Sequence, residues 1–361
     1  MTGDCLKLTI YFGESDRVDG HLLSDVLLDE FEAEQVPAAV LLRATEGFGI
    51  KHQLHTQRLL TLSEDLPLVA IAVDHREKIE ALVQRVKPLV AGGLITLERA
   101  RFMTGEVTPQ VPSELGEETK LTIYLGRTER ALGRPAYVTA VDIMRLHGLD
   151  GATVLLGVDG VAHGRRERGR FLSRNANVPL MIIASGATGV VAEALTSLAG
   201  LLRNPLVTLE RITVCKRDGK NIAEPRHLPE TDDAGLGIWQ KLMVHANEDA
   251  RHEGRALSVQ LIRRLREEGA LGATALRGIW GYSGVREPRG DRLLSFRRHV
   301  PVIAIVVDRP DAIQRWWRVI DEVTDEAGLV TSELVPAFHA VGPEIRSGGL
   351  RLSRPRGIIG R

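Results

Sequence analysis

The chain has 361 residues, of which 43% are hydrophobic, and its 47 basic residues balance 47 acidic ones. This composition predicts a globular protein of two or three domains and excludes an overall attraction to nucleic acid or an anionic membrane. No basic segment followed by an apolar stretch opens the chain, and no run approaches the roughly 18 apolar residues that cross a bilayer. We therefore expect a cytoplasmic protein whose cysteines, Cys5 and Cys215, are buried thiols.

The first hundred residues predict elements in the order βαββαβ. Alternating apolar residues are typical of a strand with one buried face, and helical spacing of apolar residues is typical of an amphipathic helix. The predicted elements are a strand at 6–12, a helix at 22–31, strands at 38–42 and 66–73, a helix at 79–90 and a strand at 94–98. This order is the split βαβ arrangement of ferredoxin-like, α+β domains.

The same order recurs twice more in register. The opening segment KLTIYFG returns as KLTIYLG and KLMVHAN, and the closing segment LITLE returns as LVTLE and LVTSE. The equivalent lysines are Lys7, Lys120 and Lys241, and the equivalent glutamates are Glu98, Glu210 and Glu333. We predict repeats over 1–104, 117–215 and 238–338, and a disordered tail rich in arginine and glycine over 339–361.

The third strand of each repeat is apolar on both faces. Both helices of a ferredoxin-like domain cover one face of the sheet, so a second apolar face must be covered by something else. We expect the neighbouring repeats to cover it, which would make the chain an intrachain pseudo-trimer that acts as a monomer. The alternative is a homo-oligomer in which each repeat packs against other chains.

Repeat 1 resembles the PII-like family catalogued as domain of unknown function 190. The resemblance rests on KLTIYFGESDR, AVLLRATEGFG, RLL, SEDLP and GGLITLE, which cover repeat 1 almost from end to end. Repeat 3 keeps GATALRGIWGYSG and DRLL, and repeat 2 departs furthest in its middle. The resemblance implies domains that trimerise like the PII signalling proteins. Those proteins bind adenine nucleotides in clefts between subunits and report them to transporters or enzymes.

The resemblance places each cleft between the loop after strand two and the turn before strand four. Glycines there would let backbone N–H groups converge on an anion, and an arginine at the end of strand two could pair with phosphate. The candidate residues are Arg43, Gly47, Phe48, Gly49, Gly92 and Gly93 in repeat 1, and Arg277, Gly281, Tyr282 and Gly284 in repeat 3. Repeat 2 has Leu156 and Pro205 instead, so its half-site is expected to be lost. The alternative is that these glycines only turn the chain.

The long loops after strand two are basic in all three repeats. The residues are Lys51, His52, His55 and Arg58, then Arg165, Arg166, Arg168 and Arg170, then Arg286, Arg289 and Arg292. In a ring of repeats these loops would form a basic rim for an anionic ligand or partner, or else they are ordinary solvated loops. His52 and His55 have no third ligand nearby, so no metal site is expected.

These features predict a PII-like regulatory protein that binds a small anionic metabolite between repeats and acts on a partner protein. An adenine nucleotide is the candidate effector. The alternative is a constitutive interaction module that docks on a membrane transporter or channel without a small ligand. RNA binding is disfavoured because strand three presents aliphatic residues rather than stacking aromatics. No nucleophile–base pair, paired carboxylates or phosphate-loop motif is found, so the chain is not expected to be an enzyme.

Overall fold

Repeat 1 of the computed structural model contains two helices and a four-stranded antiparallel sheet. The structure describes residues 2–49, 55–56, 65–103, 115–162, 164–166, 178–202, 205–284, 287–290, 300–324 and 328–349. The elements of repeat 1 are β1 (Thr2–Gly13), β2 (Arg17–Val18), β3 (His21–Leu22), α1 (Leu23–Ala33), β4 (Ala38–Arg43), β5 (Glu46–Phe48), β6 (His55–Thr56), β7 (Pro67–His75), α2 (Arg76–Val86), the 3-10 helix η1 (Lys87–Leu89) and β8 (Gly93–Met103). The four long strands lie in the order β4–β7–β1–β8.

Repeats 2 and 3 have the same arrangement. Repeat 2 consists of β9 (Glu118–Gly126), β10 (Arg130–Ala131), β11 (Arg134–Pro135), α3 (Ala136–Leu146), β12 (Gly151–Leu156), β13 (Asp159–Ala162), β14 (Arg165–Arg166), β15 (Pro179–Ala187), α4 (Thr188–Ala199) and β16 (Leu206–Arg217), and β17 (Lys220–Asn221) follows it. Repeat 3 consists of β18 (Trp239–Asn247), β19 (Arg251–His252), β20 (Arg255–Ala256), α5 (Leu257–Glu267), β21 (Ala273–Arg277), β22 (Trp280–Ser283), β23 (Arg289–Gly290), β24 (Pro301–Asp308), α6 (Pro310–Val323) and β25 (Leu329–Val335). The long strands are ordered β12–β15–β9–β16 and β21–β24–β18–β25. The chain therefore has three tandem repeats of mixed helix and strand, as its sequence predicts. None of the described helices has the length and apolar character needed to cross a bilayer.

Each sheet has one face toward its own helices and one toward the other repeats. In repeat 1, Leu8 of β1 shares a buried cluster with Phe31 of α1 and Val83 of α2. Strand residues alternate between faces, so the neighbouring residues of β1 point to the opposite side. On that side Ile71, Ile183 and Ile305, from the third strands of the three repeats, belong to one shared cluster. This packing explains why strand three is apolar on both faces.

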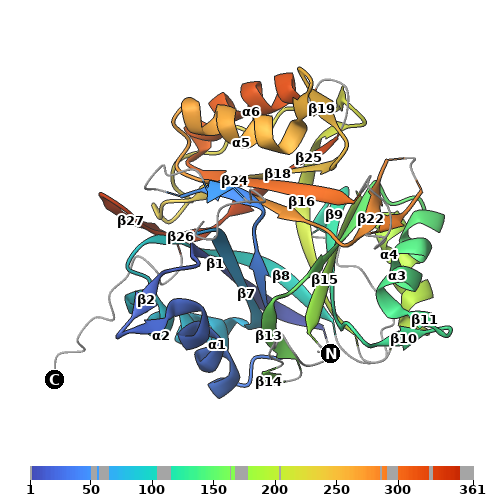
Figure 1. Cartoon of the computed structure of the whole chain (residues 1–361), viewed down its shortest axis with the longest axis horizontal. Coiled ribbons are helices and arrows are strands. Elements are labelled where there is room, and N and C mark those ends of the chain that lie inside the picture. Colours follow the sequence, from blue (N-terminus) through green and yellow to red (C-terminus); the bar gives the residue numbers. More distant parts are fainter. Residues whose placement is uncertain are drawn as a thin grey trace.

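The strand-two edge of every sheet is paired with another repeat. β5 of repeat 1 pairs with β21 of repeat 3, β13 of repeat 2 pairs with β4 of repeat 1, and β22 of repeat 3 pairs with β12 of repeat 2. These three pairings form a closed cycle. Figure 1 shows the helix pairs α1–α2, α3–α4 and α5–α6 at three outer positions, with the long strands between them.

The strand-four edges form a second closed cycle. The end of β8 pairs with β16, the end of β16 pairs with β25, and β26 (Ala337–Val341), which follows β25, pairs with β8. Unpaired edges are templates for association with other chains. Pairing both edges inside one polypeptide removes them from all three repeat sheets.

The segment after repeat 3 is ordered as far as residue 349. β26 and β27 (Ile345–Gly348) form a hairpin, and the ring of Phe338 stacks on Trp239 with centroids 4.1 Å apart. The prediction of a disordered tail is therefore wrong for residues 339–349. The local composition carries no strong strand signal, but the open edge of β8 and the ring of Trp239 provide partners for the hairpin. Residues 350–361 lie outside the described residues.

Six buried charged residues meet at the centre of the molecule, one lysine and one glutamate from each repeat. Lys7 contacts Glu98 of its own repeat and Glu210 of repeat 2, each at 2.5 Å between nitrogen and oxygen. The other contacts are Lys120 with Glu210 (2.9 Å) and Glu333, and Lys241 with Glu333 (2.9 Å) and Glu98 (2.7 Å). Every lysine thus joins a glutamate on its own sheet to one on another repeat. We call these six residues the Lys–Glu ring.

Two glutamates of the Lys–Glu ring, Glu98 and Glu333, are held in their charged form by the lysines. Burial alone would raise the pKa of Glu333, but Lys120 and Lys241 outweigh burial and lower this pKa to about 2. Burial opposes ionisation of Glu98 in the same way, and Lys241 and Lys7 place its pKa well below the usual range. Buried charges are tolerated only when they are paired, so each repeat depends on the other two.

We expect Lys7→Met to lower the free energy of unfolding by about 3–5 kcal/mol, because it leaves Glu98 and Glu210 buried with one lysine fewer. Urea denaturation followed by circular dichroism measures the change. Arg134→Met is the control, since its ion pair with Asp142 joins side chains that are 57% and 39% exposed and should cost at most about 1 kcal/mol. Equal costs for the two variants would contradict a structural role for the ring.

Candidate functional site

A cavity of about 170 Å³ lies between repeats 1 and 3. Repeat 1 supplies the end of β1, the end of β5 and the turn before β8, and repeat 3 supplies the starts of β18 and β21 and part of β24. Val341 of β26 adds a contact from the C-terminal hairpin. The cavity is therefore built by the two cycles of strand pairing that join repeat 1 to repeat 3.

Four of the six residues predicted in repeat 1 line this cavity. Phe48 and Gly49 follow strand two, Gly92 precedes strand four, and Gly93 is the first residue of strand four. Gly93 has a φ of +127°, and a Cβ there would lie 2.2 Å from the carbonyl oxygen of Tyr11. A larger residue at 93 would be strained and would also clash with β1. The structure thus brings together the two segments that the family resemblance places at one cleft.

Gly47 and the two arginines have structural partners beside the cavity. Gly47 is paired with Thr274 across β5 and β21, where a Cβ would lie 2.7 Å from the carbonyl oxygen of Ala273. Arg43 donates to Glu14 over 2.6 Å, and it does not line the cavity. The equivalent Arg277 of repeat 3 donates to Glu248 over 3.0 Å. Both arginines tie the end of strand two to the loop after strand one.

The other candidates of repeat 3 lie at its junction with repeat 2. Gly281 and Tyr282 are in β22, opposite Thr153 and Ala152 of β12. The hydroxyl of Tyr282 donates to the carbonyl oxygen of Leu149 over 3.1 Å, and a Cβ on Gly281 would lie 2.1 Å from the carbonyl oxygen of Ala152. Gly284 follows this strand with a φ of +63°. These residues join repeats 3 and 2 and do not line the cavity between repeats 1 and 3.

The lining of the cavity combines apolar walls with two carboxylates that sequence reasoning missed. The walls include Phe48, Trp239 and Ile305, all buried. Asp16 and Asp65 are the charged residues among the described lining. The first follows strand one and the second precedes strand three. Their position next to strand ends is the sequence signal for both, but a site expected to bind an anion does not predict carboxylates.

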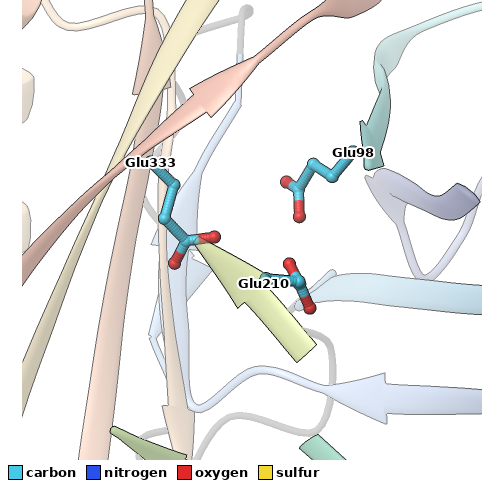
Figure 2. A group of neighbouring side chains, drawn as sticks. All are labelled: Glu98, Glu210 and Glu333. Carbon is cyan, nitrogen blue, oxygen red and sulfur yellow. The ribbon is translucent and has the colours of Figure 1, made fainter. Parts of the chain in front are cut away.

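The three glutamates of the Lys–Glu ring also resemble a metal site. Figure 2 shows the side chains of Glu98, Glu210 and Glu333 gathered from three strands, and each offers an oxygen within 4.8 Å of the others. Each carboxylate, however, already pairs with two buried lysines. A cation would have to displace these ammonium groups, so we assign the cluster to the fold.

Arg166, which was predicted to belong to the basic rim, forms ion pairs within the protein. Its guanidinium donates to Asp25 over 2.6 Å and to Asp159 over 2.8 Å, and it also pairs with Asp29. Asp25 and Asp29 belong to α1 of repeat 1, so Arg166 fastens the β13–β14 hairpin of repeat 2 to that helix. Its side chain is only 3% exposed. Arg165 and Arg289 are exposed. The remaining predicted rim side chains lie outside the description: Lys51, His52, His55, Arg58, Arg168, Arg170, Arg286 and Arg292.

We expect Arg166→Gln to lower the free energy of unfolding by about 1.5–3 kcal/mol, because it removes charge-assisted hydrogen bonds from a guanidinium that is itself shielded from water, as is its partner Asp159. Its neighbour Arg165 is exposed, and Arg165→Gln should change stability by no more than about 0.5 kcal/mol. Urea denaturation of both variants measures the difference. If Arg166→Gln is as stable as the wild type, the residue belongs to a solvated rim after all.

Comparison with known proteins agrees with the division into repeats. Residues 5–102, 118–214 and 239–337 match the model of one family, domain of unknown function 190, described as "Uncharacterized ACR, COG1993". A curated relative, "UPF0166 protein" of Aquifex aeolicus (strain VF5), is 31% identical over 99 residues. That match covers 27% of this chain and 91% of the relative, so one repeat corresponds to nearly the whole relative.

Similarity to a solved structure is weak. An aspartate kinase from Synechocystis is 9% identical with a TM-score of 0.26, over 95% of this chain and 46% of that chain. The chain thus spans less than half the length of that protein, and a similarity this weak indicates neither a shared fold nor a shared function. The three family matches cover most of the sequence and confirm the resemblance noted from its motifs. The chain belongs to the family of domain of unknown function 190 and contains three tandem copies of it.

Proposed function

We propose that the chain is a PII-like regulatory protein whose repeats are ferredoxin-like domains in an intrachain pseudo-trimer. Three observations support this architecture. Each repeat has the antiparallel strand order 4-1-3-2 along its sheet, with strands numbered within the repeat. Both sheet edges of each repeat are paired in closed cycles of three, and the Lys–Glu ring has the same cyclic pattern. The one-repeat relative would need further copies of itself to form such cycles.

The proposed activity is the binding of a small metabolite in the cavity between repeats 1 and 3. The observation that carries it is the meeting of Phe48–Gly49 and Gly92–Gly93 at an apolar cavity against another repeat. A cavity of about 150 Å³ with apolar walls is known to accept benzene, so about 170 Å³ is room for a ring. An adenine nucleotide is the candidate implied by the family resemblance. Its base would occupy the cavity, and its phosphates would lie outside.

Regulation would follow from the position of the cavity between repeats. A ligand there contacts β1, β5 and β8 of repeat 1 together with β18, β21 and β24 of repeat 3. Occupancy would therefore be sensed by strands of two repeats, which a partner protein could read at the surface. If the cavity binds no ligand, the alternative function, a constitutive interaction module, is favoured instead.

For the architecture, we expect sedimentation equilibrium to give one species of about the chain mass, 39.6 kDa, because the strand edges are already paired within the chain. The three-repeat cycles need no second polypeptide. A species of three times this mass would contradict the pseudo-trimer and favour assembly between chains.

For ligand binding, we expect millimolar ATP, ADP or AMP to raise the melting temperature. A hundredfold excess over Kd stabilises the native state by about 2.7 kcal/mol. Gly49→Leu should abolish the shift. Gly49 lines the cavity, and a Cβ built there meets no heavy atom within 4 Å, so the leucine side chain would fill free space.

Gly189→Leu is the matched control, because a Cβ at Gly189 on α4 also meets nothing within 4 Å and that residue is remote from the cavity lining. Differential scanning fluorimetry of the three proteins gives the comparison. No shift of the wild type by any nucleotide would overturn nucleotide binding. An unchanged shift in Gly49→Leu would mean that nucleotides bind elsewhere.

A further inference from the structure

Two carboxylates gather at one end of the cavity, around Gly13. A Cβ built on Gly13 would lie 3.0 Å from Oδ2 of Asp65 and 3.4 Å from Oδ1 of Asp16. Both aspartates line the cavity and both are partly buried. Because their oxygens approach the same point, they present one acidic end to whatever occupies the space.

Local hydrogen bonds fix the positions of these carboxylates without neutralising them. Oδ2 of Asp16 accepts the backbone N–H of Gly13 over 2.8 Å. Oδ1 of Asp65 accepts the N–H of Ser15 over 2.6 Å, and its Oδ2 accepts the hydroxyl of Ser15 over 2.7 Å. Within the described part of the chain, no lysine, arginine or histidine forms an ion pair with either aspartate. Ionised carboxylates only accept hydrogen bonds, so this end of the cavity calls for a donor.

The rest of the cavity suits a ring. Phe48 and Trp239 provide aromatic walls, and Ile305 and Val307 provide aliphatic ones. The indole of Trp239 is held by its stack on Phe338, with centroids 4.1 Å apart, so this wall is preformed. An anionic group in the cavity would be unfavourable next to the apolar walls, because burial there removes its hydration. It would also be unfavourable next to Asp16 and Asp65, because their negative charges repel it.

We infer that the cavity binds a small ring compound whose amino or ammonium group donates hydrogen bonds to Asp16 and Asp65. This inference rests on the proposed ligand-binding function and specifies which end of the ligand enters the cavity. It assigns ring recognition to the aromatic walls and selectivity to the two aspartates. Any phosphate or carboxylate of the natural ligand is directed away from Gly13.

Three probes with the same ring test the inference on the full chain: benzylamine, which is cationic, benzyl alcohol, which is neutral, and phenylacetate, which is anionic. Kd values come from titrations followed by nuclear magnetic resonance. We expect benzylamine to bind at least about tenfold more tightly than phenylacetate. The two nearby carboxylates attract the ammonium group of benzylamine and repel the carboxylate of phenylacetate. The double variant Asp16→Asn, Asp65→Asn should bring the two Kd values to within about threefold, with benzyl alcohol little changed.

Glu129→Gln is the matched control for this variant. Glu129 accepts the N–H of Gly126 over 2.6 Å in repeat 2, as Asp16 accepts that of Gly13 in repeat 1, but it does not line the cavity. This control should keep the preference for benzylamine. An asparagine side-chain oxygen can still accept the N–H of Gly13, and a melting curve shows whether the double variant is folded.

The outcomes separate this inference from the proposed function. If the three probes bind equally, and Gly49→Leu blocks them all, the cavity is a binding site but the acidic end does not select its ligand. If a nucleotide binds and none of the probes does, the inference is wrong while the proposed function stands. If neither nucleotides nor probes bind, both are wrong.

Discussion

The pairing of six buried charges is the constraint on which the arrangement of repeats depends. Each lysine of the Lys–Glu ring has one glutamate partner in its own repeat and another in a different repeat. Any arrangement of fewer than three repeats leaves a buried charge without a full set of partners, which is strongly unfavourable. Buried ion pairs add little net stability over apolar residues, but a buried charge without partners is costly, so the ring disfavours arrangements that leave any of the six charges unpaired.

The cavity follows from this arrangement rather than from any one repeat. Its walls come from β5 and β8 on one side and from β18, β21 and β24 on the other, and the two sides meet through β5–β21 and β26–β8 pairing. Repeat 1 alone would offer Phe48 and Gly93 to water. Among the described residues, a cavity lies at the junction of repeats 1 and 3, whereas Tyr282 and Arg166 make contacts at the other two junctions.

Sequence patterns predicted what is local and repeated, together with the covered second face of strand three, but missed the individual side-chain pairs between repeats. The family resemblance indicated the segments holding Phe48 and Gly93, whereas strand alternation and recurring motifs identified the three copies. They also aligned Lys7 with Lys120 and Lys241, but nothing in that alignment says that these side chains meet. Arg43 pairs with a carboxylate 29 residues away, and the guanidinium of Arg166 pairs with Asp29 and Asp25, which are 137 and 141 residues away. Pairings at such separations depend on the folded geometry, and so does the hairpin after residue 336.

The path of β26 has a consequence for how the protein is made. This strand leaves the ribosome long after β8 of the first repeat, yet it pairs with β8 and adds Val341 to the cavity. More than two hundred residues are therefore synthesised after β8 before its edge is covered. A chain released early has an open strand edge and an incomplete set of buried charges. Synthesis of the segment that contains β26 is thus the step that covers the edge of β8.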